Sequence, residues 1–94
     1  MRRDCDSVVA LPVYNEATTI QRVLEAAGVY ACDVLVVDDG SSDGTAELLD
    51  REPGIHLIRH PTNQGYGKSL VDAFNFAIDG GYDYVITMDA DEQH

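Results

Sequence analysis

Short, mostly apolar runs alternate along this chain with longer segments in which apolar residues recur at helical spacing. Four such runs cover residues 7–11, 34–37, 55–59 and 84–88. Apolar runs of this length, bounded by Gly, Pro and Asp, are typical of strands that are buried on both faces of a parallel sheet. We therefore predict four strands, the first of which ends at Pro12 because proline has no N–H for the sheet.

The segments between the strands predict three helices. The first has one apolar face, made by Ile20, Val23, Leu24 and Ala27. The second is short and begins near Asp43. The third has the clearest face, made by Leu70, Ala73, Phe74, Ala77 and Ile78. The resulting β-α-β-α-β-α-β order predicts the α/β class, with a Rossmann-like parallel sheet and helices on both of its faces.

Polar residues follow every predicted strand at the point where it ends. They are residues 14–16 after the first strand, Asp38 and Asp39 after the second, a glycine-bearing loop at 61–67, and residues 89–91 after the fourth. The carboxyl ends of parallel strands meet at one edge of a sheet, where open α/β sheets bind their ligands. We therefore expect a ligand site at this edge.

Asp89 and Asp91 flank one small residue, and they indicate a metal site. In an extended backbone, residues two apart point to the same side, so both carboxylates can reach one cation. Hard oxygen ligands suit Mg²⁺ or Mn²⁺, and Gln93 could add a neutral oxygen. Such a cation would neutralise a diphosphate and stabilise it as a leaving group.

Composition narrows the choice of partners. The 94 residues carry a formal charge of −11, which argues against nucleic acid or an anionic membrane as the main partner of this segment. The two cysteines lack a metal-like or framework spacing, so we expect them reduced and the protein cytoplasmic. No apolar run approaches transmembrane length. The three histidines lack metal-like spacing, and we expect them at the surface or at strand edges.

Two other interpretations of the motifs stay open at this point. Residues 67–69 (Gly-Lys-Ser) open a helix after a strand, as in the phosphate-binding loop of a nucleoside triphosphatase, but Thr62 stands where that motif has its first glycine. A non-enzymatic calcium-binding module is the second alternative. Its EF-hand-like ligand positions would be Asp39, Ser41, Asp43, Gly44 and Asp50, although a strand and not a helix enters the loop.

Four sequence blocks, in order, resemble the family 2 glycosyltransferases. They are LPVYNE at 11–16, VVDDGSSDGT at 36–45, NQGYGK at 63–68 and MDADEQH at 88–94. The last block is most similar to the polyprenyl-phosphate sugar transferases, the dolichyl-phosphate mannose synthase group. The resemblance spans nearly the whole chain, which makes it far more specific than any single block.

This resemblance implies a GT-A nucleotide-sugar domain that transfers a sugar from a nucleoside diphosphate sugar to an acceptor, in this subgroup a polyprenyl phosphate. By match to the family blocks, Pro12, Tyr14 and Glu16 would wrap the base and ribose. Asp39, together with Asp38, would recognise the base or ribose. Lys68 is a candidate contact of a donor phosphate. The metal ligands implied are Asp89, Asp91 and Gln93, and Asp89 would also belong to the residues that bind the nucleotide sugar.

The chain stops just after the Asp-x-Asp motif, so the hypothesis is that residues 1–94 form one donor-binding half-domain. The acceptor site and the catalytic base of the family would then lie elsewhere, as would any membrane-associated part. In this half-domain the fourth strand would lack a neighbour on one side. We therefore expect self-association through an exposed sheet edge, or marginal stability.

Overall fold

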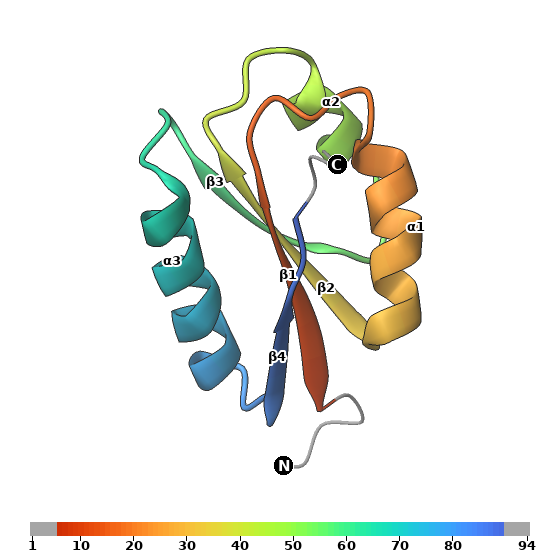
Figure 1. Cartoon of the computed structure of the whole chain (residues 1–94), viewed down its shortest axis with the longest axis vertical. Helices are drawn as coiled ribbons and strands as arrows, with labels where there is room; N and C mark the ends of the chain where they lie inside the picture. Colours follow the sequence, from red (N-terminus) through yellow and green to blue (C-terminus); the bar gives the residue numbers. More distant parts are fainter. Residues whose placement is uncertain (1–5, 90–94) are drawn as a thin grey trace.

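The computed structural model describes residues 6–89 and shows the predicted alternation of strands and helices (Figure 1). The α/β, Rossmann-like fold class is confirmed. In chain order the elements are β1 (Ser7–Val13), α1 (Ile20–Tyr30), β2 (Asp33–Asp39), α2 (Thr45–Asp50), β3 (His56–His60), α3 (Tyr66–Asp79) and β4 (Tyr84–Thr87).

The four strands are parallel and lie in the spatial order β3-β2-β1-β4. The chain therefore moves outward from β1 through β2 to β3, and then returns to place β4 on the other side of β1. The strand order reverses between β1 and β4. In open α/β sheets, the crevice outside the carboxyl ends of the strands at such a point is the usual ligand site.

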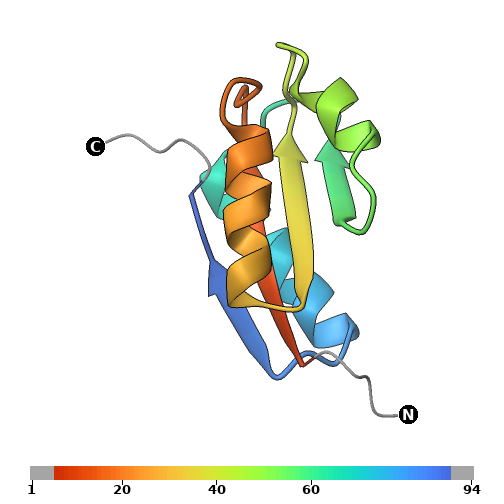
Figure 2. The ribbon, with the colours of Figure 1, turned by 90° about the vertical axis from the view of Figure 1, so that its right-hand side faces the viewer.

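Helices cover both faces of the sheet, which explains why the central strands read as continuous apolar runs. Figure 2 shows α1 in front of the sheet and α3 behind it. On the α1 face, Val9, Leu11 and Val36 pack against that helix and against Leu49 of α2. On the α3 face the buried residues are Val8, Ala10, Leu35, Val37, Ala73 and Ala77.

The first two strands are longer than their sequence pattern predicts. β1 continues through Pro12, which lies beside Val37 of β2. Proline is tolerated there because the pairing of β1 with β4 ends at Ala10, so that β1 has a neighbour on only one side from this point on. β2 continues to Asp39 because its last residues pair with β3 up to His60.

The packed face of α3 matches the predicted one only in part. Ala73 and Ala77 are buried as predicted, together with Ser69, whereas Phe74 and Ile78 are 45% and 73% exposed. Phe76 packs against the core instead, 6.0 Å from the ring of Tyr82. The helix has apolar residues on more than one face, and the sheet selects the face whose small residues allow a close approach.

Two findings bear on the predicted redox state of the cysteines and on the presence of membrane-spanning segments. Cys32 is disulfide-bonded, so the expectation of reduced cysteines is wrong for this residue. Spacing along the sequence did not indicate this bridge, because a single disulfide depends on which segments the fold brings together. Among residues 6–89, no helix is both long enough and apolar enough to cross a membrane. The cytoplasmic location stays a prediction.

Candidate functional site

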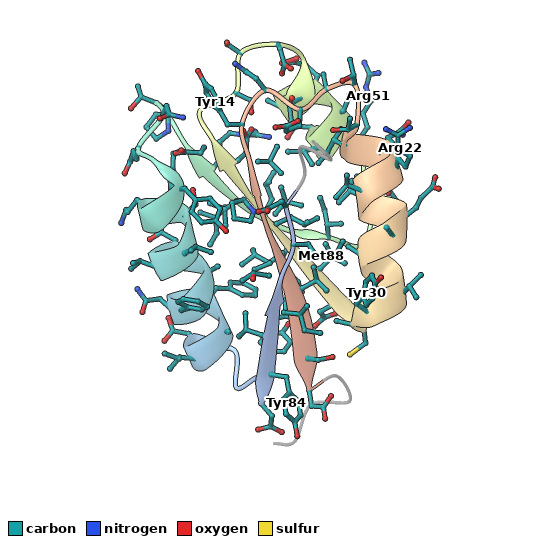
Figure 3. The ribbon with its side chains drawn as sticks, viewed as in Figure 1. Tyr14, Arg22, Tyr30, Arg51, Tyr84 and Met88 are labelled. Atoms are coloured by element: carbon teal, nitrogen blue, oxygen red, sulfur yellow. The ribbon has the colours of Figure 1, made fainter. Side chains whose placement is uncertain are left out.

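A cavity of about 300 Å³ opens at the carboxyl edge of the sheet. Its size is at the lower end of the range typical of small-molecule sites. Figure 3 labels Tyr14 at this end of β1, whereas Tyr84 marks the opposite end of the sheet. The lining residues end β1 and β2, follow β1, β3 and β4, or lie in the first turn of α3: Pro12, Val13, Tyr14, Glu16, Asp39, Asn63, Gly65, Tyr66, Ser69 and Asp89.

Five of the seven residues predicted to bind a nucleotide sugar line this cavity. They are Pro12, Tyr14, Glu16, Asp39 and Asp89. The structure thus brings together residues that lie as far as 77 positions apart in the sequence, from Pro12 to Asp89. The other two predicted residues, Asp38 and Lys68, do not line the cavity, and their side chains form contacts outside it.

The loop after β1 is held by the loop after β2. Asn15 has a left-handed backbone, with φ of 53°. Its N–H donates to Ser41 Oγ at 3.0 Å, and its side-chain oxygen accepts from the N–H of Ser42 at 2.8 Å. The N–H of Glu16 donates to Thr45 Oγ1 at 3.0 Å. These bonds fix the backbone at Asn15 and Glu16, directly after Tyr14, so the side chains of Tyr14 and Glu16 are positioned at the cavity.

Asp38 is fully buried and supports the site from outside it. Its carboxylate accepts from the N–H of Ser41 at 3.1 Å and from Arg59 Nε at 3.3 Å. Arg59 also contacts Asp50 at 3.1 Å and the carbonyl of Ala46 at 3.2 Å. Asp38 therefore connects β2 to β3 and, through Arg59, to α2. The structure does not place it among the residues that line the cavity.

Asp39 lines the cavity although it is only 5% exposed. Its Oδ1 accepts from the N–H of Gln64 at 2.8 Å and contacts His60 Nδ1 at 2.7 Å, and its Oδ2 accepts from the N–H of Gly65 at 2.9 Å. Burial alone would raise the pKa of Asp39, but these hydrogen bonds outweigh burial and hold the pKa below its ordinary value. The side chain is therefore an ionised, fixed acceptor.

His60 is buried behind the site, so the expectation of a surface histidine is wrong for it, although it does lie at the end of the edge strand β3. Its Nε2 lies 2.6 Å from Asp72 Oδ2, opposite the contact with Asp39. The signal that could have found it is register: in the parallel pair of β2 and β3, His60 lies directly beside Asp39. Sequence spacing alone does not reveal that register.

The loop before α3 and the first turn of that helix supply lining residues to which the sequence analysis assigned no role in the site. Asn63, Gly65, Tyr66 and Ser69 all line the cavity. Asn63 Nδ2 also donates to the carbonyl oxygen of Asp39 at 3.4 Å. Lys68, which we did single out, is half exposed and lies 3.1 Å from Asp72 across one helical turn, outside the cavity lining. This geometry gives no support to a nucleoside triphosphatase loop.

The carboxylates of the calcium-loop hypothesis have separate partners. Asp39 contacts His60, Asp50 contacts Arg59, and Asp43 accepts from the N–H groups of Thr45 and Ala17 at 3.0 and 3.2 Å. Within residues 6–89, no group of three or more His, Cys, Asp or Glu side chains could hold a metal ion. The calcium interpretation therefore has no support in this part of the chain.

Asp89 is the one predicted metal ligand that falls within the described residues. Its exposed side chain lines the cavity, where it offers the hard oxygen that Mg²⁺ and Mn²⁺ prefer. Asp91 and Gln93 lie outside the described residues. The chemistry of Asp89 fits the proposed cation, and the completion of the ligand set stays a prediction.

Fold and site together define a Rossmann-like α/β domain with a cavity, lined by acidic residues and tyrosines, at the reversal point of its sheet. The chain belongs to glycosyl transferase family 2, because the model of that family matches residues 8–94. The resemblance described above is confirmed by this match, which covers nearly the whole chain.

Curated relatives show the same relationship. An undecaprenyl-phosphate mannosyltransferase of Micrococcus luteus is 37% identical over 92 residues, and a polyprenol monophosphomannose synthase of Mycolicibacterium smegmatis is 32% identical over 96. An undecaprenyl-phosphate 4-deoxy-4-formamido-L-arabinose transferase of Yersinia enterocolitica is 37% identical over 98. These matches cover 89%, 94% and 92% of this chain, but only 37%, 36% and 29% of the respective relatives.

Proposed function

We propose that this chain is the donor- and metal-binding half-domain of a glycosyltransferase that moves a sugar from a nucleoside diphosphate sugar to a polyprenyl phosphate. The observation that carries the proposal is the cavity, which is lined by residues from all four sequence blocks that resemble the family.

The lining residues offer suitable chemistry for the nucleoside. Tyr14 is 47% exposed at the rim, so its ring can pack against a base. Asp39 and Glu16 present carboxylates that accept hydrogen bonds from ribose hydroxyls or base N–H groups. Pro12 stiffens the end of β1 where these contacts would form. The N-terminal end of α3, at Gly65 and Tyr66, borders the same cavity, and a helix N-terminus favours a negatively charged group.

We propose Asp89, together with Asp91 and Gln93, as the ligands of Mg²⁺ or Mn²⁺. When bound, the cation would supply charge neutralisation of the diphosphate, which an acidic cavity cannot provide by itself. Both Glu16 and Asp39 would otherwise repel the phosphates. The sequence charge of −11 makes this requirement stronger.

Replacing Asp89 by alanine is expected to weaken nucleoside diphosphate binding in the presence of Mg²⁺ by at least about tenfold, since one charged ligand contact is lost. Binding of UDP and GDP to the purified protein, measured by isothermal titration calorimetry with Mg²⁺ and with EDTA, tests this. Asp83→Ala is the control, because Asp83 is exposed at the other end of β4. Equal affinity of the wild-type protein in Mg²⁺ and in EDTA would contradict the metal proposal.

The acceptor is proposed from the relatives. Two of the three relatives described above have undecaprenyl phosphate in their names, and the third is a polyprenol monophosphomannose synthase. A polyprenyl phosphate is therefore the acceptor class that we propose for the protein to which this half-domain belongs. Membrane association would reside in parts outside the described residues.

We also propose that the chain self-associates through its exposed apolar surface. β4 is an edge strand, and Val71, Phe74 and Ile78 form an exposed stripe on one face of α3. Sedimentation velocity between low and high protein concentration should show a rise in mean mass. Ile78→Lys should reduce that rise, whereas Val29→Lys, at a residue of α1 that is 81% exposed, should not. A monomer at every concentration would contradict the proposal.

A further inference from the structure

Four side chains of alternating charge run from the cavity to the protein surface. Asp39, at the cavity, contacts His60 Nδ1 at 2.7 Å; His60 Nε2 contacts Asp72 at 2.6 Å; and Asp72 contacts Lys68 Nζ at 3.1 Å. Exposure increases along the series, from 6% for the Asp39 side chain and 7% for His60 to 20% for Asp72 and 49% for Lys68. The series crosses three elements: β2, β3 and α3.

The geometry requires a charged imidazole ring. Both ring nitrogens of His60 lie within hydrogen-bond distance of carboxylate oxygens, and an ionised carboxylate can only accept. Each nitrogen must therefore carry a hydrogen. The hydrogen bonds to Asp39 and Asp72 raise the pKa of His60 against the effect of burial, and the pKa values of both carboxyls are lowered. A proton on either carboxyl would require a raised pKa there, whereas the pKa values of both carboxyls are lowered.

His60 and two backbone amides use most of the acceptor capacity of Asp39. Oδ1 bonds to His60 and to the N–H of Gln64, whereas Oδ2 bonds only to the N–H of Gly65. A carboxylate oxygen accepts about two hydrogen bonds. Among the described residues, one acceptor position therefore remains, on Oδ2, and Asp39 lines the cavity.

We propose that His60 is a positioning residue of the nucleotide site: as an imidazolium bridging Asp39 and Asp72, it holds the Asp39 carboxylate so that one acceptor position on Oδ2 meets the ligand. The inference rests on the proposed function, because it assigns Asp39 to nucleotide binding. One base N–H or one ribose hydroxyl satisfies that position. His60 itself touches no ligand, since it lies behind Asp39 and is not among the lining residues.

Nucleotide affinity should therefore depend on pH in a defined direction. The groups that face His60 are Asp39 from β2, and Asp72 with its partner Lys68 from α3; Glu16 and Asp89 add negative charge across the cavity. Because the pKa of His60 is raised from 6.5, its bridge is fully formed below that value and is lost as the pH rises through the higher pKa of the folded state. Affinity should be constant below this transition and fall above it.

His60→Asn is the first variant to test. The asparagine amide can still donate to Asp39, but it carries no charge and is too short to bridge to Asp72. The dissociation constants of UDP and GDP with Mg²⁺ should rise about tenfold at pH 7, and the fall in affinity at higher pH should disappear. The matched control is His56→Asn on the same strand, since His56 is exposed and its carboxylate neighbour is Asp33, 3.7 Å away.

A second measurement needs neither ligand nor variant. At pH 6.5, where an ordinary imidazole is half charged, the ¹⁵N shifts of the His60 ring should show mainly two protonated nitrogens, and a mainly neutral ring would overturn the proposal. Asp72→Asn, near the surface end of the series, should move the fall in affinity to lower pH. If His60→Asn does not fold, Asp72→Asn and the ring shifts still test the positioning role of His60.

The outcomes separate this inference from the proposed function. Wild-type affinity and an unchanged pH profile in His60→Asn would overturn the positioning role while leaving nucleotide binding intact. Failure of the folded wild-type protein to bind UDP or GDP would overturn both. Loss of affinity in His60→Asn with the wild-type pH profile retained would indicate a structural role only, and would also count against the proposal.

Discussion

Replacing Gly40 by alanine is expected to lower the free energy of unfolding by about 2–4 kcal/mol. Gly40 has a φ of 80°, which is costly for alanine, and an added Cβ would lie 2.5 Å from the backbone N of Asn63 and the carbonyl carbon of Thr62. These are backbone atoms, so no flexible side chain can move aside. Urea unfolding followed by circular dichroism measures the loss.

Gly54→Ala is a matched control for this prediction. Gly54 has nearly the same φ, 79°, but a Cβ there meets no atom within 4 Å. Its substitution should cost only the backbone strain, about 1 kcal/mol. The difference between the two variants isolates the overlap of the loop after β2 with the loop before α3. Equal losses at both glycines would show that this close approach does not limit stability.

The Gly40 substitution should also weaken nucleotide binding. The overlap would push Asn63 away from β2, and the next two residues donate the backbone N–H groups that hold Asp39. The close approach of two loops is therefore what places an ionised carboxylate at the cavity. Titration of UDP and GDP into Gly40→Ala, under conditions where it remains folded, should show lower affinity than the same titration into Gly54→Ala.

The sequence was enough to predict the order of elements, because each apolar run and each helical spacing is a local signal. It predicted only part of the face of α3 that packs against the sheet. Ala73 and Ala77 are buried as predicted, whereas Phe74 and Ile78, which were predicted on the same face, are largely exposed. The deciding factor is how closely a helix can approach a sheet, which depends on the strands that it covers.

Much of the site could also be predicted, since the ends of parallel strands converge wherever they lie in the chain. The different roles of Asp38 and Asp39 could not be predicted, because we predicted that the strand ends at Val37. Once β2 extends to Asp39, strand alternation separates the two carboxylates. Asp39 lies on the same face of the sheet as Val37, which α3 covers. Asp38 lies on the same face as Val36, which α1 and α2 cover.

This separation predicts opposite outcomes for two adjacent substitutions. Asp38→Asn removes the charge that pairs with Arg59, and because Arg59 is partly exposed and also contacts Asp50, the expected loss of stability is moderate, about 1–2 kcal/mol. Nucleotide affinity should stay within about twofold of the wild type, since Asp38 does not line the cavity. Thermal unfolding and calorimetric titration measure the two effects.

Asp39→Asn should have its main effect on binding. An amide NH₂ in place of one carboxylate oxygen would face a donor, either the Gly65 N–H or the pair from His60 and Gln64, so the side chain cannot keep its present position. Loss of a charged acceptor should weaken nucleoside diphosphate binding by about 10- to 100-fold. Titrations at a temperature where both variants are folded compare them directly. If Asp38→Asn weakened binding as much as Asp39→Asn, the two carboxylates would share one role, and the assignment of Asp39 alone to the ligand would be wrong.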